Sequence, residues 1–237
     1  MGKSTIQPAD GAMSLTFYRA SRLMCRFIKF QCISETVLHA DRAERPGGLL
    51  LAVTHLSHLE PIVVSAALER HVRWMARIEF YRSWWAGAML RRGGAFPVDR
   101  FGYSLPAVRR AIELVRRGEL VGIFPEGGVA KGAQSMMRGG PIKQGICTIA
   151  LRTGVPIVPV VVLGTHELNR VGPWIPPRRG KLFVAFGRDV VPPPYRLGSP
   201  ATNRAARHSL AMALRSEVER TYGELLAHAG LTDSDVP

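Results

Sequence analysis

A histidine and a carboxylate stand five residues apart, directly after an apolar segment. They are His55 and Glu60, within Thr54-His55-Leu56-Ser57-His58-Leu59-Glu60-Pro61. A carboxylate that accepts one imidazole N–H fixes the tautomer and leaves the other ring nitrogen to take a proton from a hydroxyl group. The pair could therefore serve as a general base and its orienting partner. A helix-capping loop whose histidines only form hydrogen bonds is the alternative.

A metal site formed by His55, His58 and Glu60 is a weaker hypothesis. The spacing does not resemble HExxH, and no fourth ligand is evident. The cysteines Cys25, Cys32 and Cys147 form no CxxC pair, so they indicate neither a zinc site nor a disulfide framework. We expect no bound metal and a reducing compartment.

A second segment with chemical potential is Glu126-Gly127-Gly128, after the apolar run Leu120–Phe124. Glycines expose backbone N–H groups to a phosphate or an oxyanion, and Glu126 could organise the turn. A plain turn after a strand is the alternative for this segment on its own.

The elements that would position these residues alternate between strands and helices. Expected strands are Leu49–Val53, Val72–Ala76, Gly94–Val98, Leu120–Phe124, Val155–Leu163 and Leu182–Phe186. Expected helices are Pro61–Arg70, Glu79–Arg91, Ser104–Arg117, Ile142–Arg152 and Asn203–His228, the second with Phe80, Trp84, Trp85 and Ala88 facing inward. This alternation predicts a single α/β domain with a mixed, mostly parallel sheet flanked by helices. Sites in such sheets gather in loops beyond the strand ends, where both segments above lie.

The N-terminal stretch Met13–Ile33 predicts a basic amphipathic helix. Arg19, Arg22, Arg26 and Lys29 recur at intervals of three and four residues, opposite an apolar side. Such a helix can lie in the headgroup region of an anionic membrane, or it can pack on its own domain with a solvated basic face. We therefore divide the chain into an N-terminal tail and membrane-associating helix at 1–45, a catalytic core at 46–200, and a C-terminal helix and tail at 201–237.

The composition favours a folded protein with an anionic partner. The chain has 237 residues, 46% of them hydrophobic, with 32 Lys and Arg against 18 Asp and Glu, a formal net charge of +14. The basic residues are dispersed and no RNP, GXXG or zinc pattern is present, which argues against nucleic acid. No apolar stretch approaches the ~20 residues that span a bilayer, and no secretory signal is evident. We expect a cytoplasmic protein, peripheral on the inner face of the cell membrane.

Four short segments follow one another in a consistent order between Leu49 and Gly164. They read THLSHLEP at 54–61, GAFPVDR at 94–100, FPEGGVA at 124–130 and VPIVPV at 155–160. Together they resemble the motifs of the glycerolipid acyltransferase superfamily, the group of 1-acylglycerol-3-phosphate acyltransferases. The first family motif is a histidine, four residues and an aspartate, and the third is FPEGTR-S. Lys143-Gln144-Gly145 resembles the lysine-glycine step before the fourth motif.

The resemblance implies transfer of a fatty acyl group from acyl-CoA or acyl carrier protein to the hydroxyl of a lysophosphatidate-type lipid, without a cofactor. It implies that His55 is the general base, that Glu60 is its orienting carboxylate, and that direct attack expels the thiolate. The residues implied to bind substrate are Arg100 near the acceptor phosphate, Glu126, Gly127 and Gly128 around the acceptor pocket, Ser57 and Lys143.

Two departures from the family pattern bear on the substrate. Glu60 replaces the aspartate, which sets the carboxylate one methylene further out. Gly128 and Val129 stand where the family has Thr and Arg, and that arginine is expected to bind phosphate. Lys131, Arg138, Arg91 or Arg92 could take its place, or the acceptor could be a glycolipid or an ornithine-type lipid. Hydrolysis of the thioester and a non-catalytic membrane-binding role are the remaining alternatives.

Overall fold

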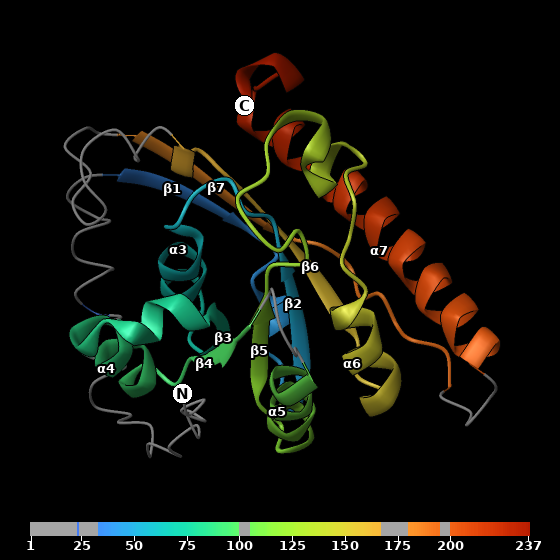
Figure 1. The fold of residues 1–237 in the computed structure, drawn as a ribbon. Helices are drawn as coiled ribbons and strands as arrows, with labels where there is room; N and C mark the ends of the chain where they lie inside the picture. Colours follow the sequence, from blue (N-terminus) through green and yellow to red (C-terminus); the bar gives the residue numbers. More distant parts are fainter. Residues whose placement is uncertain (1–22, 24–32, 100–104, 167–179, 195–199) are drawn as a thin grey trace.

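A seven-stranded sheet organises the computed structural model, which describes residues 23, 33–99, 105–166, 180–194 and 200–237 (Figure 1). The strands are β1 (Ile33–Leu38), β2 (Leu49–Val53), β3 (Val72–Arg77), β4 (Phe96–Val98), β5 (Leu120–Ile123), β6 (Ile157–Leu163) and β7 (Gly180–Phe186). The α-helices are α2 (Asp41–Glu44), α3 (Glu60–Ala67), α4 (Trp84–Arg92), α5 (Leu105–Arg116), α6 (Gly145–Thr153) and α7 (Pro200–Ala229). Short 3-10 turns complete the described chain: η1 (Ile78–Arg82), η2 (Gly132–Gln134), η3 (Met136–Arg138) and η5 (Asp233–Asp235).

The strand order is β1-β7-β6-β2-β5-β3-β4. Every neighbouring pair is parallel except β6 and β7, which run antiparallel. The mixed, mostly parallel sheet flanked by helices is therefore confirmed. β2 lies between β5 and β6 with all three parallel, so their carboxyl ends meet at one edge of the sheet. The loops that follow these three strands build the site described below.

The central strands are apolar because both faces of the sheet are covered. All five residues of β2 and all seven of β6 are buried. Leu50 and Ala52 pack in the cluster that contains α5, α6 and α7, whereas Leu49 and Leu51 pack in the cluster that contains α3. Figure 1 shows α5, α6 and α7 on one side of the sheet and α3 on the other. Burial on both faces explains the unbroken apolar runs, which are typical of parallel strands.

The six predicted strands are all present, Leu49–Val53 with the predicted bounds and the other five with shifted ends, but β1 was not predicted. It pairs in parallel with β7 from Ile33–Gly180 to Leu38–Ala185, at the edge of the sheet. Its sequence ISETVL contains polar residues because an edge strand is only partly covered. The predicted helix Met13–Ile33 lies outside the described residues except for Leu23 and for its last residue, Ile33, which begins β1.

The prediction for Glu79–Arg91 was wrong in two respects. The segment forms η1 and then α4, separated by Ser83 in an extended conformation with φ −76° and ψ 125°. Phe80, Trp84 and Trp85 are exposed rather than inward-facing. Gly87 is the buried residue of α4, because its missing side chain lets the helix lie against the backbone of Tyr81. Within the described residues, no helix is long and apolar enough to cross a membrane.

Candidate active site

The loop that carries the histidine is tied to the edge of the sheet where β2 and β6 end. The Thr54 backbone N–H donates to the Val160 carbonyl at 3.0 Å, and the Thr54 hydroxyl accepts from the Val162 backbone N–H at 3.0 Å. Thr54 is completely buried. The next residue, His55, therefore leaves the sheet from a fixed point.

His55 and Glu60 form the pair that the spacing predicts. His55 Nδ1 lies 3.1 Å from Glu60 Oε2, with the histidine side chain 13% exposed and the glutamate fully buried. Glu60 opens α3, where the helix dipole favours a negative charge. A carboxylate at Nδ1 holds the proton on that nitrogen and directs Nε2 away from Glu60 as the acceptor of a further proton.

The second oxygen of Glu60 is held by two donors. Its Oε1 accepts from the Ser57 backbone N–H at 2.7 Å and from the Thr165 hydroxyl at 2.6 Å. Thr165 follows β6 and is buried. The carboxylate is therefore fixed from its own loop and from the neighbouring strand end, which satisfies a charge that would be costly to bury alone.

Glu126 fixes the backbone of the histidine rather than its ring. One carboxylate oxygen accepts from the His55 backbone N–H at 2.7 Å, and the other accepts from the Ser135 hydroxyl at 2.9 Å and the Met136 backbone N–H at 2.8 Å. Burial raises the pKa of Glu126, and these three donors oppose the rise. The Ala130 backbone N–H also donates to the His55 carbonyl at 2.9 Å. Glu126 thus joins the loop after β2 to the loop after β5.

An aromatic wall orients the imidazole. The His55 ring stacks on Phe124 with centroids 4.2 Å apart and planes 28° apart, and Phe124 stacks on Trp74 at 5.2 Å and 14°. Gly122 makes room for Trp74, since a Cβ there would lie 2.6 Å from the indole ring. This wall limits ring rotation and restricts water on one side of the imidazole.

His58 lies beside the pair but outside it. Its ring is exposed and stands edge-on to His55 at 5.8 Å between centroids. Burial of part of the ring, followed by the neighbouring His55, lowers the pKa of His58. Glu60 forms hydrogen bonds with His55, the Ser57 backbone N–H and the Thr165 hydroxyl, so the geometry favours His55 over His58 as the base.

The glycine turn after β5 lies against a lysine. Gly127 has φ +77°, and a Cβ there would overlap the Lys143 side chain. The Lys143 backbone N–H donates to the Pro125 carbonyl at 2.8 Å, which fixes the lysine beside the turn. Gly128 is half-buried and Val129 is exposed on the same loop. Of the predicted substrate-binding residues, the structure therefore brings together Gly127, Gly128 and Lys143.

Arg138 and Arg100 were also predicted as possible ligands of the acceptor phosphate. Arg138 is occupied, because its guanidinium binds the Asp233 carboxylate at 2.8 Å and the carbonyls of Asp233, Val236 and Pro237 at the C-terminus. It is therefore not a free phosphate ligand. Arg100, predicted near the acceptor phosphate, lies outside the described residues.

Sequence reasoning missed Thr165 and Phe124. Both follow buried parallel strands, β6 and β5, so the rule that sites gather at carboxyl strand ends could have found them. Within the described residues, no group of three His, Cys, Asp or Glu is arranged to hold a metal ion. Cys147 is buried in the core, and burial raises its pKa to about 11.

The arrangement of a buried carboxylate, a histidine and a glycine turn can be compared with known proteins. The model of the family described as Acyltransferase matches residues 35–163, more than half of the chain, including His55, Glu60, Glu126 and Lys143. The chain belongs to the acyltransferase family. The predicted resemblance to glycerolipid acyltransferases is therefore confirmed, and the protein is an enzyme of the acyltransferase class.

Relatives of this acyltransferase have related names. It is 30% identical over 152 residues to a 1-acyl-sn-glycerol-3-phosphate acyltransferase of Bacillus subtilis (strain 168), which covers 64% of this chain and 71% of the relative. It is 38% identical over 90 residues to the chloroplastic 1-acyl-sn-glycerol-3-phosphate acyltransferase BAT2 of Brassica napus, covering 37% of this chain and 24% of that protein.

The fold has a counterpart among solved structures. The 1-acyl-sn-glycerophosphate (LPA) acyltransferase PlsC of Thermotoga maritima superposes with a TM-score of 0.62 at 19% identity. The match covers 90% of this acyltransferase and 79% of the other chain. It confirms the fold of the acyltransferase.

Proposed function

We propose that the protein transfers a fatty acyl group from a thioester, acyl-CoA or acyl carrier protein, to the free hydroxyl of 1-acylglycerol 3-phosphate. The single observation that carries the proposal is the contact between His55 Nδ1 and the buried Glu60 carboxylate, 3.1 Å apart. The names of the Bacillus and Brassica relatives support the choice of acceptor.

In the proposed reaction, His55 Nε2 accepts the proton of the acceptor hydroxyl while the hydroxyl oxygen attacks the thioester carbonyl carbon. A C–O bond forms, the C–S bond breaks, and the thiolate leaves with the proton that the imidazolium returns. Glu60 stabilises the imidazolium and holds the ring in one tautomer. No acyl-enzyme intermediate is needed, since the hydroxyl attacks directly.

The acceptor phosphate needs a cation near the glycine turn. Lys143 is suited to this role because its side chain lies against Gly127. Gly127 comes directly after Glu126, whose carboxylate accepts a hydrogen bond from the His55 backbone N–H. The family arginine is absent, since Val129 stands in its place. Arg100 is the second proposed ligand, from the family resemblance. The proposed place of action is the cytoplasmic face of the membrane, which holds the acceptor.

The test is acyl transfer by the purified protein from labelled oleoyl-CoA, or from oleoyl carrier protein, to detergent-dispersed 1-acylglycerol 3-phosphate. His55→Ala should lower the rate by roughly 10²- to 10⁴-fold, the usual contribution of a general base. His58→Ala is the matched control and should keep the rate within about threefold, because the imidazole that lies at the Glu60 carboxylate is that of His55.

Three results would contradict the proposal. Turnover retained by His55→Ala would move the base to another residue. Labelled free fatty acid in place of lipid would indicate hydrolysis. A labelled product of different mass, from total lipid but not from 1-acylglycerol 3-phosphate, would assign another acceptor such as a glycolipid or an ornithine-type lipid.

A further inference from the structure

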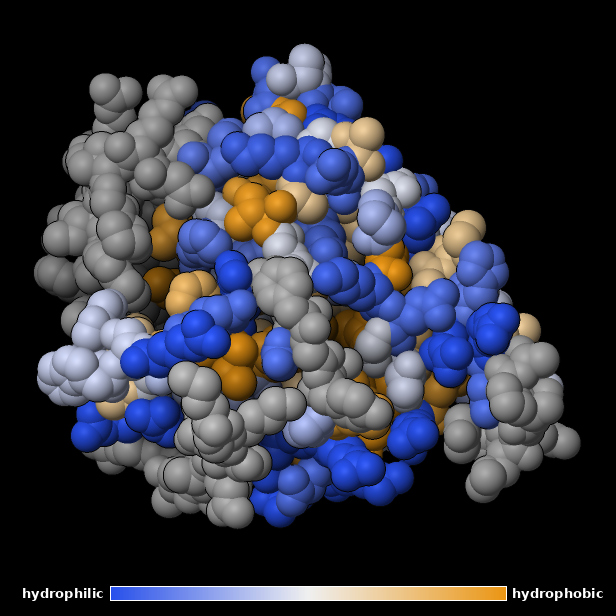
Figure 2. All heavy atoms as spheres, viewed as in Figure 1, coloured by the Kyte–Doolittle hydropathy of each residue, from blue (hydrophilic) through white to orange (hydrophobic). Residues whose placement is uncertain are grey.

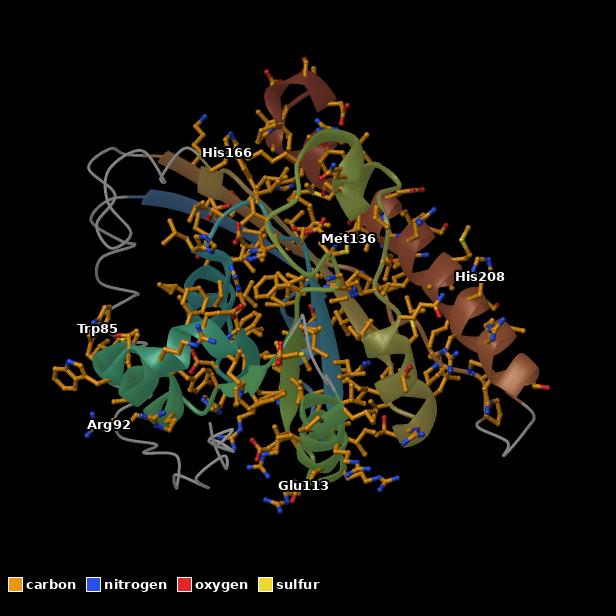
Figure 3. All side chains as sticks on the ribbon, in the orientation of Figure 1. Trp85, Arg92, Glu113, Met136, His166 and His208 are labelled. Carbon is orange, nitrogen blue, oxygen red and sulfur yellow. The ribbon has the colours of Figure 1, made fainter. Side chains whose placement is uncertain are left out.

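Four large apolar side chains are exposed together on η1 and α4. They are Phe80 (44% exposed), Trp84 (83%), Trp85 (48%) and Met89 (38%), which we call the α4 surface. Figure 3 shows Trp85 at the outer side of α4, directed away from the body of the molecule. Exposed apolar clusters of this kind mark interaction sites, and tryptophan is enriched where one side of a surface is wet and the other is apolar.

The α4 surface is bordered by positive charge. Arg82, Arg91 and Arg92 are exposed, and Figure 3 shows Arg92 on the same outer side as Trp85. From Ile78 to Arg92 the sequence contains one acidic residue, Glu79, which lies 3.5 Å from Arg77. Figure 2 shows pale side chains over α4 with blue, hydrophilic ones next to them. The surface thus joins an apolar centre to a cationic border, on a chain with a net charge of +14.

The α4 surface is held in place by contacts on its inner side. Gly87 lies so close to η1 that a Cβ would be 3.0 Å from the Tyr81 carbonyl oxygen. At the end of α4, His71 Nε2 and the Gly93 carbonyl lie 2.9 Å apart. Because the glycine side of α4 faces the protein, the tryptophans are turned outward. Their exposure is therefore a consequence of how the helix is anchored.

The α4 surface reaches the catalytic histidine through a chain of rings. Phe80 is edge-on to His58 at 6.5 Å, and His58 is edge-on to His55 at 5.8 Å. The Arg77 guanidinium lies 5.8 Å from the Phe80 centroid, a cation–π distance. The Phe80 end of the α4 surface is therefore separated from His55 by one intervening ring, that of His58.

We propose that the α4 surface docks the enzyme on an anionic phospholipid bilayer. Trp84 and Trp85 would enter the headgroup region, where amphipathic rings are favoured, and Arg82, Arg91 and Arg92 would contact lipid phosphates. Bilayer-held lipid acceptors would then meet His55 at the rim of the docked face; this last step rests on the proposed acyl transfer, whereas docking itself does not.

Quenching of tryptophan fluorescence by brominated lipid tests the docking directly. The probe is vesicles of equal parts phosphatidylglycerol and brominated phosphatidylcholine, mixed with the full chain and with Trp84→Phe. The difference in emission between the full chain and Trp84→Phe is the emission of Trp84. The vesicles should quench roughly half or more of this Trp84 emission. This readout reports on α4 itself, whichever other segment binds the bilayer. Emission from Trp84 that brominated lipid leaves unchanged would overturn the proposal.

Binding and activity provide the second test. Arg91→Gln/Arg92→Gln should weaken vesicle binding by roughly fivefold for each arginine, and Trp84→Ala/Trp85→Ala by about tenfold. The matched controls are Arg109→Gln/Arg116→Gln on α5 and Met212→Ala on α7, which change exposed residues of the same kinds elsewhere. The controls should bind as the unchanged protein does.

Trp84→Ala/Trp85→Ala should lose transfer to acceptor embedded in vesicles and keep transfer to acceptor dispersed in detergent. Absence of transfer to detergent-dispersed acceptor by the unchanged protein, with Trp84 quenched by brominated lipid, would count against the proposed chemistry and not against docking. Equal vesicle binding by α4 variants and controls would overturn the docking proposal. Unchanged binding with loss of transfer from acyl carrier protein alone would assign the α4 surface to that acidic donor instead.

Discussion

The Thr165 hydroxyl donates a 2.6 Å hydrogen bond to Glu60 Oε1, across 105 residues of sequence. The contact forms because β6 runs parallel to β2, so that Thr165 and the loop after β2 leave the same edge of the sheet. Glu60 uses its other oxygen for His55. The threonine therefore holds the carboxylate oxygen that does not contact the histidine, and in the proposed reaction it positions the carboxylate of the base.

Removing the Thr165 hydroxyl should lower the catalytic rate as well as the stability of the fold. Thr165→Val keeps the shape of the side chain but removes one of the two donors to Oε1 and leaves the Ser57 backbone N–H. We expect kcat to fall by about tenfold, and the free energy of unfolding to fall by roughly 2 kcal/mol, as for a hydrogen bond to a charged group. Thr165→Ser should restore both. Transfer kinetics and thermal unfolding measure the two effects, and an unchanged kcat in Thr165→Val would remove the positioning role.

Shortening the carboxylate tests whether the loop is built around glutamate. Glu60 Oε1 and Oε2 reach Ser57, Thr165 and His55 at 2.7, 2.6 and 3.1 Å, and an aspartate at the same backbone position would withdraw from them by about the length of one C–C bond. A misplacement of that order can cost ~10²-fold in rate, so we expect Glu60→Asp to lower kcat substantially although the family carries aspartate here. Steady-state kinetics beside Glu60→Gln provide the measurement. An Asp variant as active as the unchanged protein would show that backbone adjustment absorbs the difference.

The fold could largely be predicted from the sequence because its strands are buried on both faces. Runs such as Leu49–Val53 and Ile157–Leu163 have no polar residue to mislead the assignment. β1 is different, since its polar, partly covered sequence ISETVL lies at the sheet edge and depends on pairing with β7, about 147 residues away. Long-range pairing of a weak pattern is not visible in local sequence.

In the candidate site, too, contacts between residues close in sequence could be predicted, and contacts that depend on long-range packing could not. His55 and Glu60 lie five residues apart at one strand-to-helix junction, so their spacing predicts the contact. Thr165 was missed because its partner lies on another strand end. The exposure of Trp84 was missed because large apolar residues usually face a core. In α4 it is Gly87 that packs against the protein, on Tyr81, and Trp84 therefore faces outward.

Neutralising Lys143 should affect acceptor binding more than the chemical step. The lysine lies against Gly127 in the turn, and the hydrogen-bond partners of the Glu60 carboxylate are His55, Ser57 and Thr165. Lys143→Gln removes a charge that would attract the acceptor phosphate, so we expect KM for 1-acylglycerol 3-phosphate to rise by roughly tenfold with little change in kcat. The comparison is Lys131→Gln, an exposed lysine on the same loop region. Equal effects of the two variants, or a fall confined to kcat, would contradict a phosphate contact at Lys143.

Acid should destabilise the anchor of α4 through His71. Burial lowers the pKa of His71 to about 4, from an ordinary value of 6.5, while its hydrogen bond to the Gly93 carbonyl opposes the shift and nearby Arg73 adds to it. Between about pH 6.5 and about pH 4, His71 is protonated in the unfolded chain but not in the folded protein. The free energy of unfolding therefore falls as the pH is lowered from about 6.5 to about 4, by at most about 3 kcal/mol from this residue.

His71→Gln tests this effect, because glutamine can donate to the Gly93 carbonyl and does not titrate. Denaturant unfolding across this pH range should show a smaller decrease in the free energy of unfolding for the variant than for the unchanged protein. At neutral pH the two proteins should have similar stability. The difference has a functional side, since the same bond holds the end of α4. Acid should therefore weaken quenching of Trp84 by brominated lipid in the unchanged protein before it does so in His71→Gln. Parallel stability curves for the two proteins would show that acid loss of stability arises at other groups.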